Sequence, residues 1–119
     1  MIVYGIKNCD TVKKARAFLD GAGVAYTFHD YKKDGADAEK LTQFVEAFGW
    51  EQVLNRRGTT WRKLPDEVQD AVKDNASAIA LMLEHPSAIK RPIAEAKGRT
   101  LLGYDPVAWE MALEMGELG

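Results

Sequence analysis

The sequence is poor in cysteine, in proline and in long apolar stretches. Cys9 is its one cysteine, which excludes an internal disulfide and a zinc or iron–sulfur site built from several cysteines of one chain. A single cysteine fits a reducing compartment best. Four prolines and ten glycines among 119 residues are too few for a collagen-like or low-complexity chain. The composition therefore predicts an ordinary globular protein that folds on its own core.

The chain also has little net charge. Sixteen lysines and arginines stand against eighteen aspartates and glutamates, which leaves a formal net charge of −2 and does not favour non-specific attraction to nucleic acid or anionic membranes. The N-terminal segment lacks the features of a secretion signal, and each later apolar stretch ends well short of a membrane span. We expect a cytoplasmic, bacterial-type protein that contacts neither nucleic acid nor a membrane directly, so any anion site must be local.

Hydrophobic periodicity predicts an α/β protein. The apolar run Ile2–Ile6 is typical of a buried strand, and apolar spacings of three and four residues from Thr11 to about Gly21 predict an amphipathic helix. The β-branched and aromatic segment 25–31 predicts a second strand, parallel to the first. Helices are expected next over 37–49, 50–54, 65–74 and 78–84, with Asp37 and Ser77 as N-caps.

The C-terminal part predicts two more strands and a last helix. Segments 89–95 and 99–102 flank a short loop and are expected to pair in antiparallel fashion. Asp105 and Pro106 begin the final helix. Its inward face is assigned to Val107, Ala108, Met111, Ala112 and Met115. This order predicts a single thioredoxin-like domain over 1–119: a small four-stranded mixed sheet flanked by helices, with an all-helical insertion at about 37–84 after the second strand.

Cys9 lies between the first predicted strand and the first predicted helix. Unpaired backbone N–H groups and the helix dipole favour a thiolate at this position, and nearby lysines add positive potential. Asp10 opposes a thiolate unless its side chain turns away to cap the helix. A lone cysteine also commonly packs as a small hydrophobic residue. Position alone leaves both the catalytic and the packing interpretation open.

Arginines supply the other candidate groups. Four cations, Arg56, Arg57, Arg62 and Lys63, fall within eight residues and can hold an oxyanion or a carboxylate, although solvated surface charge is the alternative. Arg91 precedes Pro92 at the start of the third strand. A cis bond there would bring the backbone of Arg91 beside the cysteine in a thioredoxin-like fold, but trans bonds are more frequent. The two histidines are too isolated for a metal site, so none is expected.

Three segments together carry a family resemblance. They are Tyr-Gly-Ile-Lys-Asn-Cys-Asp-Thr at 4–11, Arg-Gly-Thr-Thr-Trp-Arg-Lys-Leu at 57–64, and His-Pro-Ser-Ala-Ile-Lys-Arg-Pro-Ile at 85–93. In order and spacing they resemble the ArsC/Spx family of arsenate reductase-related proteins, most closely its YffB subgroup, over essentially the whole chain. The resemblance implies a thioredoxin-like fold with a helical insertion and a reactive cysteine at the first helix.

The resemblance implies roles for individual residues. Cys9 matches the reactive cysteine, and Arg56 and Arg91 match catalytic arginines. Substrate or glutathione binding is assigned to Asn8, Thr11, Arg57 and Pro92. Gly103 stands where arsenate reductases of the family have a third arginine, and Val12 stands where Spx-type regulators often have the second cysteine of a redox switch. An ordinary arsenate site is therefore disfavoured. An intrachain redox switch is impossible, so a regulator built on that switch is disfavoured as well.

With these two alternatives disfavoured, the sequence still predicts a site with a single thiol and several arginines. With no second cysteine, an external thiol must release the product, and glutathione is the natural co-substrate, with no bound cofactor. We expect a glutathione-dependent thiol–disulfide reductase or transferase acting on a small thiol or disulfide, with glutaredoxin as a candidate partner. One alternative is a degenerate arsenate reductase. Another is a non-catalytic, Spx-like module that binds a protein such as RNA polymerase through the acidic residues Glu110, Glu114 and Glu117, which a solvated helix face explains equally well.

Overall fold

The computed structural model describes residues 1–118 and divides the chain into two compact units. The first unit is formed by Met1–Tyr31 together with the chain from Arg91 onward, and the second by Lys32–Lys90. The segment expected as a helical insertion, about 37–84, falls inside the second unit. No helix within the described part of the chain is long and apolar enough to cross a membrane.

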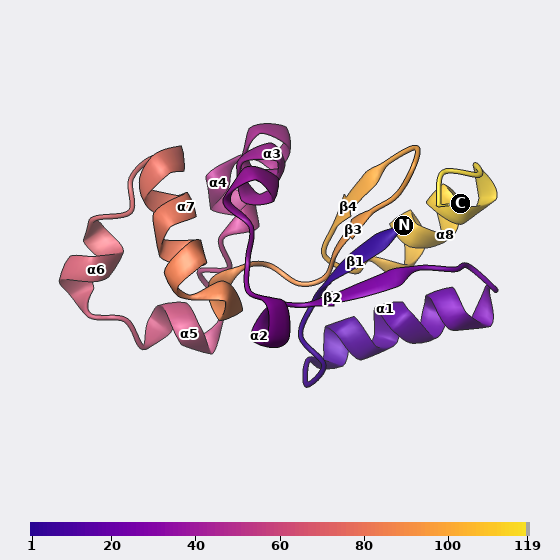
Figure 1. Cartoon of the computed structure of the whole chain (residues 1–119), viewed down its shortest axis with the longest axis horizontal. Helices are drawn as coiled ribbons and strands as arrows, with labels where there is room; N and C mark the ends of the chain where they lie inside the picture. Colours follow the sequence, from indigo (N-terminus) through magenta and orange to yellow (C-terminus); the bar gives the residue numbers. More distant parts are fainter. Residues whose placement is uncertain (119) are drawn as a thin grey trace. The chain divides into compact units, whose positions relative to one another are not determined.

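The first unit is built on a four-stranded mixed sheet (Figure 1). Its strands are β1 (Ile2–Gly5), β2 (Thr27–Asp30), β3 (Ile93–Glu95) and β4 (Thr100–Leu102), in the spatial order β2-β1-β3-β4. β1 is parallel to β2 and antiparallel to β3, and β3 is antiparallel to β4. The parallel pairing of β1 with β2 and the antiparallel pairing of β3 with β4 are those predicted from the sequence. Each strand is shorter than its apolar run, and Tyr31 already begins the short helix α2 (Tyr31–Asp34).

Strand register decides which face of the sheet carries the core of this unit. Val3 pairs with Ala94, and Ala94 pairs with Leu101, so these three side chains lie on one face. Two helices pack on that face, α1 (Asp10–Gly21) and α8 (Pro106–Glu114). The shared core also contains Ala15, Leu19, Trp109, Ala112 and Leu118. A four-stranded mixed sheet flanked by helices confirms the predicted α/β fold class.

The predicted inward face of α8 is right at Ala112, which is fully buried, and wrong at Val107, Met111 and Met115. Val107, Met111 and Met115 are 67%, 53% and 70% exposed, whereas Trp109 is 1% exposed. Trp109 packs edge-on against Tyr104, with ring centroids 5.1 Å apart, and its indole N–H donates to the carbonyl of Gly103 at 3.0 Å. Burial of the large Trp109 ring, whose N–H has a hydrogen-bond partner, stabilises the fold more than burial of the smaller valine and methionine side chains would. The helix is therefore turned so that tryptophan faces the sheet.

The second unit is helical. Its elements are α3 (Ala38–Phe48), α4 (Trp50–Val53), α5 (Thr59–Arg62), α6 (Asp66–Asp70), α7 (Asn75–Glu84) and the 3-10 turn η1 (Pro86–Ala88). As predicted, Asp37 caps α3 by accepting the backbone N–H of Lys40, and Gly49 ends the helix with φ +87°. The helix predicted over 65–74 is shorter, and α5 forms between the segments 50–54 and 65–74, where the sequence predicts no helix. The side chain of Gln69 donates to the carbonyl of Trp61 at 2.8 Å and so links α6 to α5.

Two details of α7 also differ from expectation. The N-cap is Asp74, and Ser77 occupies the third helical position, where the two residues exchange hydrogen bonds as a capping box. Both residue types favour N-caps, so the sequence alone could not separate them. The helix buries one face through Ala78, Leu81 and Met82, which pack toward α3, while Leu83 is exposed. The segment 78–84 is apolar on almost all sides and by itself predicts a fully buried helix, so its exposed side is a second departure from expectation.

Candidate functional site

Cys9 is the N-cap residue of α1, in the first unit. Its carbonyl accepts the backbone N–H of Lys13 at 2.9 Å, which closes the first turn of the helix. Gly5 at the end of β1 lets the first turn of α1 pack closely against the strand, because a Cβ on Gly5 would lie 2.9 Å from a methyl carbon of Val12. Cys9 is half-buried, while its neighbours Asn8 and Thr11 are exposed. The thiol is thus held at a helix N-terminus and remains accessible.

Several groups act on the pKa of the Cys9 thiol. Burial raises this pKa, but the backbone N–H of Val12, the hydrogen bond and the positive charge of the Arg91 guanidinium, and the backbone N–H of Thr11 all lower it. The net effect is a pKa below the ordinary thiol value. A thiolate is the nucleophilic form of cysteine, so the site increases the fraction of Cys9 that can react. These contacts favour the catalytic interpretation over that of an inert packing residue.

Arg91 and Pro92 immediately precede β3. The peptide bond between them is cis. Pro92 is buried, and its carbonyl accepts the backbone N–H of Gly103 at 2.7 Å, which ties the start of β3 to the end of β4. Arg91 is half-buried and reaches the sulfur of Cys9 with its side chain. The sheet therefore brings together two residues that are far apart in the sequence.

A cluster of aromatic residues occupies the sheet near Arg91. The rings of Tyr4, His29 and Tyr31 lie with centroids 5.1 to 6.1 Å apart, and the hydroxyl of Tyr4 donates to Glu95 at 3.2 Å. Burial, and then the proximity of Tyr4, raise the pKa of Tyr31 far above its usual range, although the charge of Arg91 acts in the opposite direction. Tyr31 therefore stays a neutral phenol over a wider pH range than an ordinary tyrosine and adds no negative charge near Arg91.

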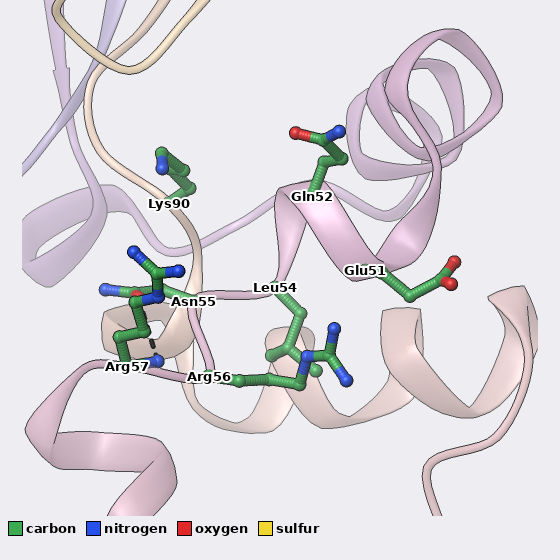
Figure 2. Close-up of a pocket in the computed structure, with 7 residues that line it drawn as sticks. All are labelled: Glu51, Gln52, Leu54, Asn55, Arg56, Arg57 and Lys90. Atoms are coloured by element: carbon green, nitrogen blue, oxygen red, sulfur yellow. Dashed lines mark hydrogen bonds between the residues drawn. The ribbon is translucent and has the colours of Figure 1, made fainter.

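The other predicted arginines lie in the second unit. Arg56 and Arg57 are exposed and line a pocket of about 280 Å³ (Figure 2). The guanidinium of Arg56 lies over the ring of Trp50, 5.5 Å from its centroid, which is within the range of a cation–π contact. The structure thus brings Arg56 and Arg57 together in one pocket, and Cys9, Arg91 and Pro92 together in the other unit.

Sequence reasoning missed three residues. Asn55 and Lys90 line the same pocket as Arg57, and Tyr31 shares electrostatic interactions with Arg91. Lys90 stands next to Arg91 in a segment that the sequence had already singled out, which was the available signal. Among residues 1–118, no group of three or more histidine, cysteine, aspartate or glutamate side chains is arranged to hold a metal ion.

Comparison with known proteins shows what the chain is similar to. The profile of the ArsC family matches residues 4–112. The solved structure of a YffB protein is 54% identical, covers 94% of this chain and 97% of its own, and superposes with a TM-score of 0.90. An arsenate reductase (ArsC) related protein from Brucella melitensis is 53% identical, with 95% and 93% covered and a TM-score of 0.72. The global transcriptional regulator Spx of Streptococcus agalactiae serotype V is 29% identical over 82% of this chain and 72% of its own.

Proposed function

The chain belongs to the ArsC family and is arsenate reductase-like or Spx-like; from this premise we propose that it is a glutathione-dependent thiol–disulfide reductase or transferase. Cys9 is the nucleophile, Arg91 stabilises its thiolate, and glutathione is the co-substrate. The remaining assigned residues keep their expected roles, Arg56 in catalysis and Asn8, Thr11, Arg57 and Pro92 in binding.

One observation carries this proposal: the thiol of Cys9 lies at the start of α1 within reach of the Arg91 side chain, and its pKa is lowered. A cysteine that served only to fill the core would need neither the helix N-terminus nor a guanidinium partner. Because the chain has no other cysteine, the covalent intermediate can be resolved only by a thiol from outside.

The proposed reaction is a disulfide exchange in two steps. The Cys9 thiolate attacks the glutathione sulfur of a mixed disulfide, forms a new disulfide with glutathione and releases the substrate as a thiolate, which takes a proton from water. A second glutathione, as thiolate, then attacks the sulfur of the bound glutathione. This step regenerates the Cys9 thiolate and releases oxidised glutathione. Overall, the mixed disulfide is reduced to the free substrate thiol, and its glutathione is joined to the second glutathione as oxidised glutathione.

Reduction of arsenate is less well supported. Gly103, which stands at the position of the third arginine, has φ +74°, a backbone conformation that favours glycine. Its N–H donates to Pro92 and its carbonyl accepts from the Trp109 indole, so both backbone groups are engaged in holding the sheet and α8. A side chain that could bind an oxyanion is absent at this position for a structural reason.

A partner-binding module is the second candidate function. Val107, Met111 and Met115 expose an apolar stripe on α8, and Glu110 and Glu114 lie on the same exposed side of the helix. A stripe of this kind is a common feature of surfaces that bind other proteins. A redox switch of the Spx type is not available to such a module, because the residue three positions after Cys9 is Val12, which is completely buried.

The two candidates are separated by intact-mass measurement after incubation with oxidised glutathione. The reductase proposal requires the addition of one glutathione to the parent chain, its loss when excess reduced glutathione is added, and no addition to the Cys9→Ser variant. Arg91→Gln should slow the addition, because the thiolate loses the hydrogen bond and the charge of the guanidinium. If the parent gains no mass under conditions that modify a small thiol, the reductase proposal is refuted and the binding module becomes the better account.

A further inference from the structure

A polar pocket in the second unit contains an excess of positive charge. It is lined by Glu51, Gln52, Leu54, Asn55, Arg56, Arg57 and Lys90. Figure 2 shows Arg57 on the same side of this pocket as Asn55 and Lys90, while Arg56 points toward the opposite side. Because Arg56 is stacked on Trp50, the cations on the Asn55 side are Arg57 and Lys90.

The backbone beneath these side chains is held firmly. The N–H of Asn55 donates to the carbonyl of Ala88 at 2.7 Å, and the N–H of Lys90 donates to the carbonyl of Val53 at 2.8 Å. Between these two bonds, Leu54 forms an antiparallel bridge with Ile89, and both side chains are buried. Asn55 and Lys90 therefore project from two short segments that hydrogen bonds and a buried contact fix side by side. A binding site gains precision when its side chains come from such a fixed backbone.

Asn55 is oriented within the pocket. Its side-chain oxygen accepts the backbone N–H of Arg57 at 3.2 Å, so its amide NH₂ points away from that N–H. A Cβ on Gly58 would lie 2.8 Å from this amide nitrogen, so a glycine at position 58 leaves room for the amide in this orientation. With its oxygen directed to the N–H of Arg57, Asn55 has its amide N–H groups available as hydrogen-bond donors for a ligand.

The three side chains share the chemistry of an anion site. Arg57 offers a planar pair of donors, Lys90 a compact charge and Asn55 an amide donor. Throughout residues 1–118, neither Arg57 nor Lys90 forms an ion pair with an acidic side chain. Glu51 lines the same pocket, but Figure 2 shows its carboxylate directed away from Arg57 and Lys90. The planar fork of the Arg57 guanidinium matches the two oxygens of a carboxylate, which is the group that we assign to this pocket.

We infer that Asn55, Arg57 and Lys90 form a binding site for a carboxylate-bearing small molecule, with Arg57 as the bidentate partner and Lys90 as a specificity-determining cation. Gly58 is a positioning residue that acts through Asn55. The inference rests on the proposed function only for the identity of the ligand, because glutathione carries two carboxylates. The binding itself requires no reaction at Cys9.

The test is a titration of the reduced full chain with S-methylglutathione, which keeps both carboxylates but cannot form a disulfide. NMR shift perturbation and calorimetry report where and how tightly it binds. Arg57→Gln and Lys90→Gln should each weaken binding about tenfold, as expected for the loss of one charge-assisted contact. Lys33→Gln removes an exposed cation of the same unit outside the pocket and should leave the affinity unchanged. Gly58→Ala should weaken binding less, with shifts centred on Asn55.

The outcomes separate this inference from the proposed function. Equal affinity of the parent, Arg57→Gln and Lys90→Gln overturns the inference, even if Cys9 still forms a disulfide with glutathione. Shifts at the pocket with inorganic phosphate but none with S-methylglutathione overturn the assignment to carboxylates. If both variants weaken binding while the parent gains no mass with oxidised glutathione, the carboxylate site stands and the reductase proposal fails.

Discussion

Replacing Gly103 by alanine is expected to lower the free energy of unfolding by about 1 kcal/mol. Gly103 has φ +74°, and an L-residue in this left-handed region carries a strain of about 1 to 2 kcal/mol. Alanine also reduces the freedom of the unfolded chain, which returns about 0.4 to 1 kcal/mol. The strain exceeds that gain, so the net change is destabilising. The hydrogen bonds from Gly103 to Pro92 and from Trp109 to Gly103 use backbone groups and can persist in the variant.

Equilibrium unfolding in urea, followed by circular dichroism, measures this difference. Gly21→Ala is the matched control, because Gly21 ends α1 without a positive φ and a Cβ there meets nothing within 4 Å. The control should be as stable as the parent or more stable by up to about 1 kcal/mol. A Gly103→Ala chain with the stability of the parent and an unchanged urea dependence would refute the argument that backbone geometry requires glycine here. The position would then be free to carry an arginine.

Three further predictions concern the thiol and its chemistry. Iodoacetamide should modify Cys9 half-maximally at a pH below that of a free thiol, and Arg91→Gln should move this midpoint upward; identical profiles would show that Arg91 does not tune the thiol. Because the folded-state pKa of Cys9 is lowered, the unfolded chain binds more protons between the two pKa values, so stability should rise with pH across that window relative to Cys9→Ser. Parallel pH–stability curves for the two chains would contradict this linkage. Arsenate reduction should be absent or very weak even when glutathione and glutaredoxin are supplied, and robust turnover would show that the arginine missing at Gly103 is not required.

Local patterns in the sequence predicted much of the fold. The buried run at Ile2–Ile6, the helical spacing that starts near Thr11 and the cap at Asp37 each gave an element close to its observed bounds. These signals succeed because strand alternation, helix periodicity and capping depend on residues that are neighbours along the chain. The position of Cys9 at the junction of strand and helix follows from the same patterns.

The patterns failed where a choice between faces or caps depended on distant partners. Val107, Met111 and Met115 have the spacing of a buried stripe, yet α8 buries Trp109 instead. A helix that is apolar on most sides has no single preferred face of its own, so the ring that best fits the neighbouring surface decides its rotation. Phe18 and Tyr104 provide that surface for Trp109.

The sequence by itself determined that a lone cysteine stands at a helix N-terminus and that arginines cluster near position 57. Only the tertiary structure decided which basic side chain lies beside Cys9 and which one lies beside Arg57. Arg91 reaches Cys9 because β3 pairs with β1, and Lys90 joins Arg57 because Leu54 bridges Ile89. Both pairings join segments far apart along the chain, and their register is set by which buried side chains pack together. No local periodicity carries that information.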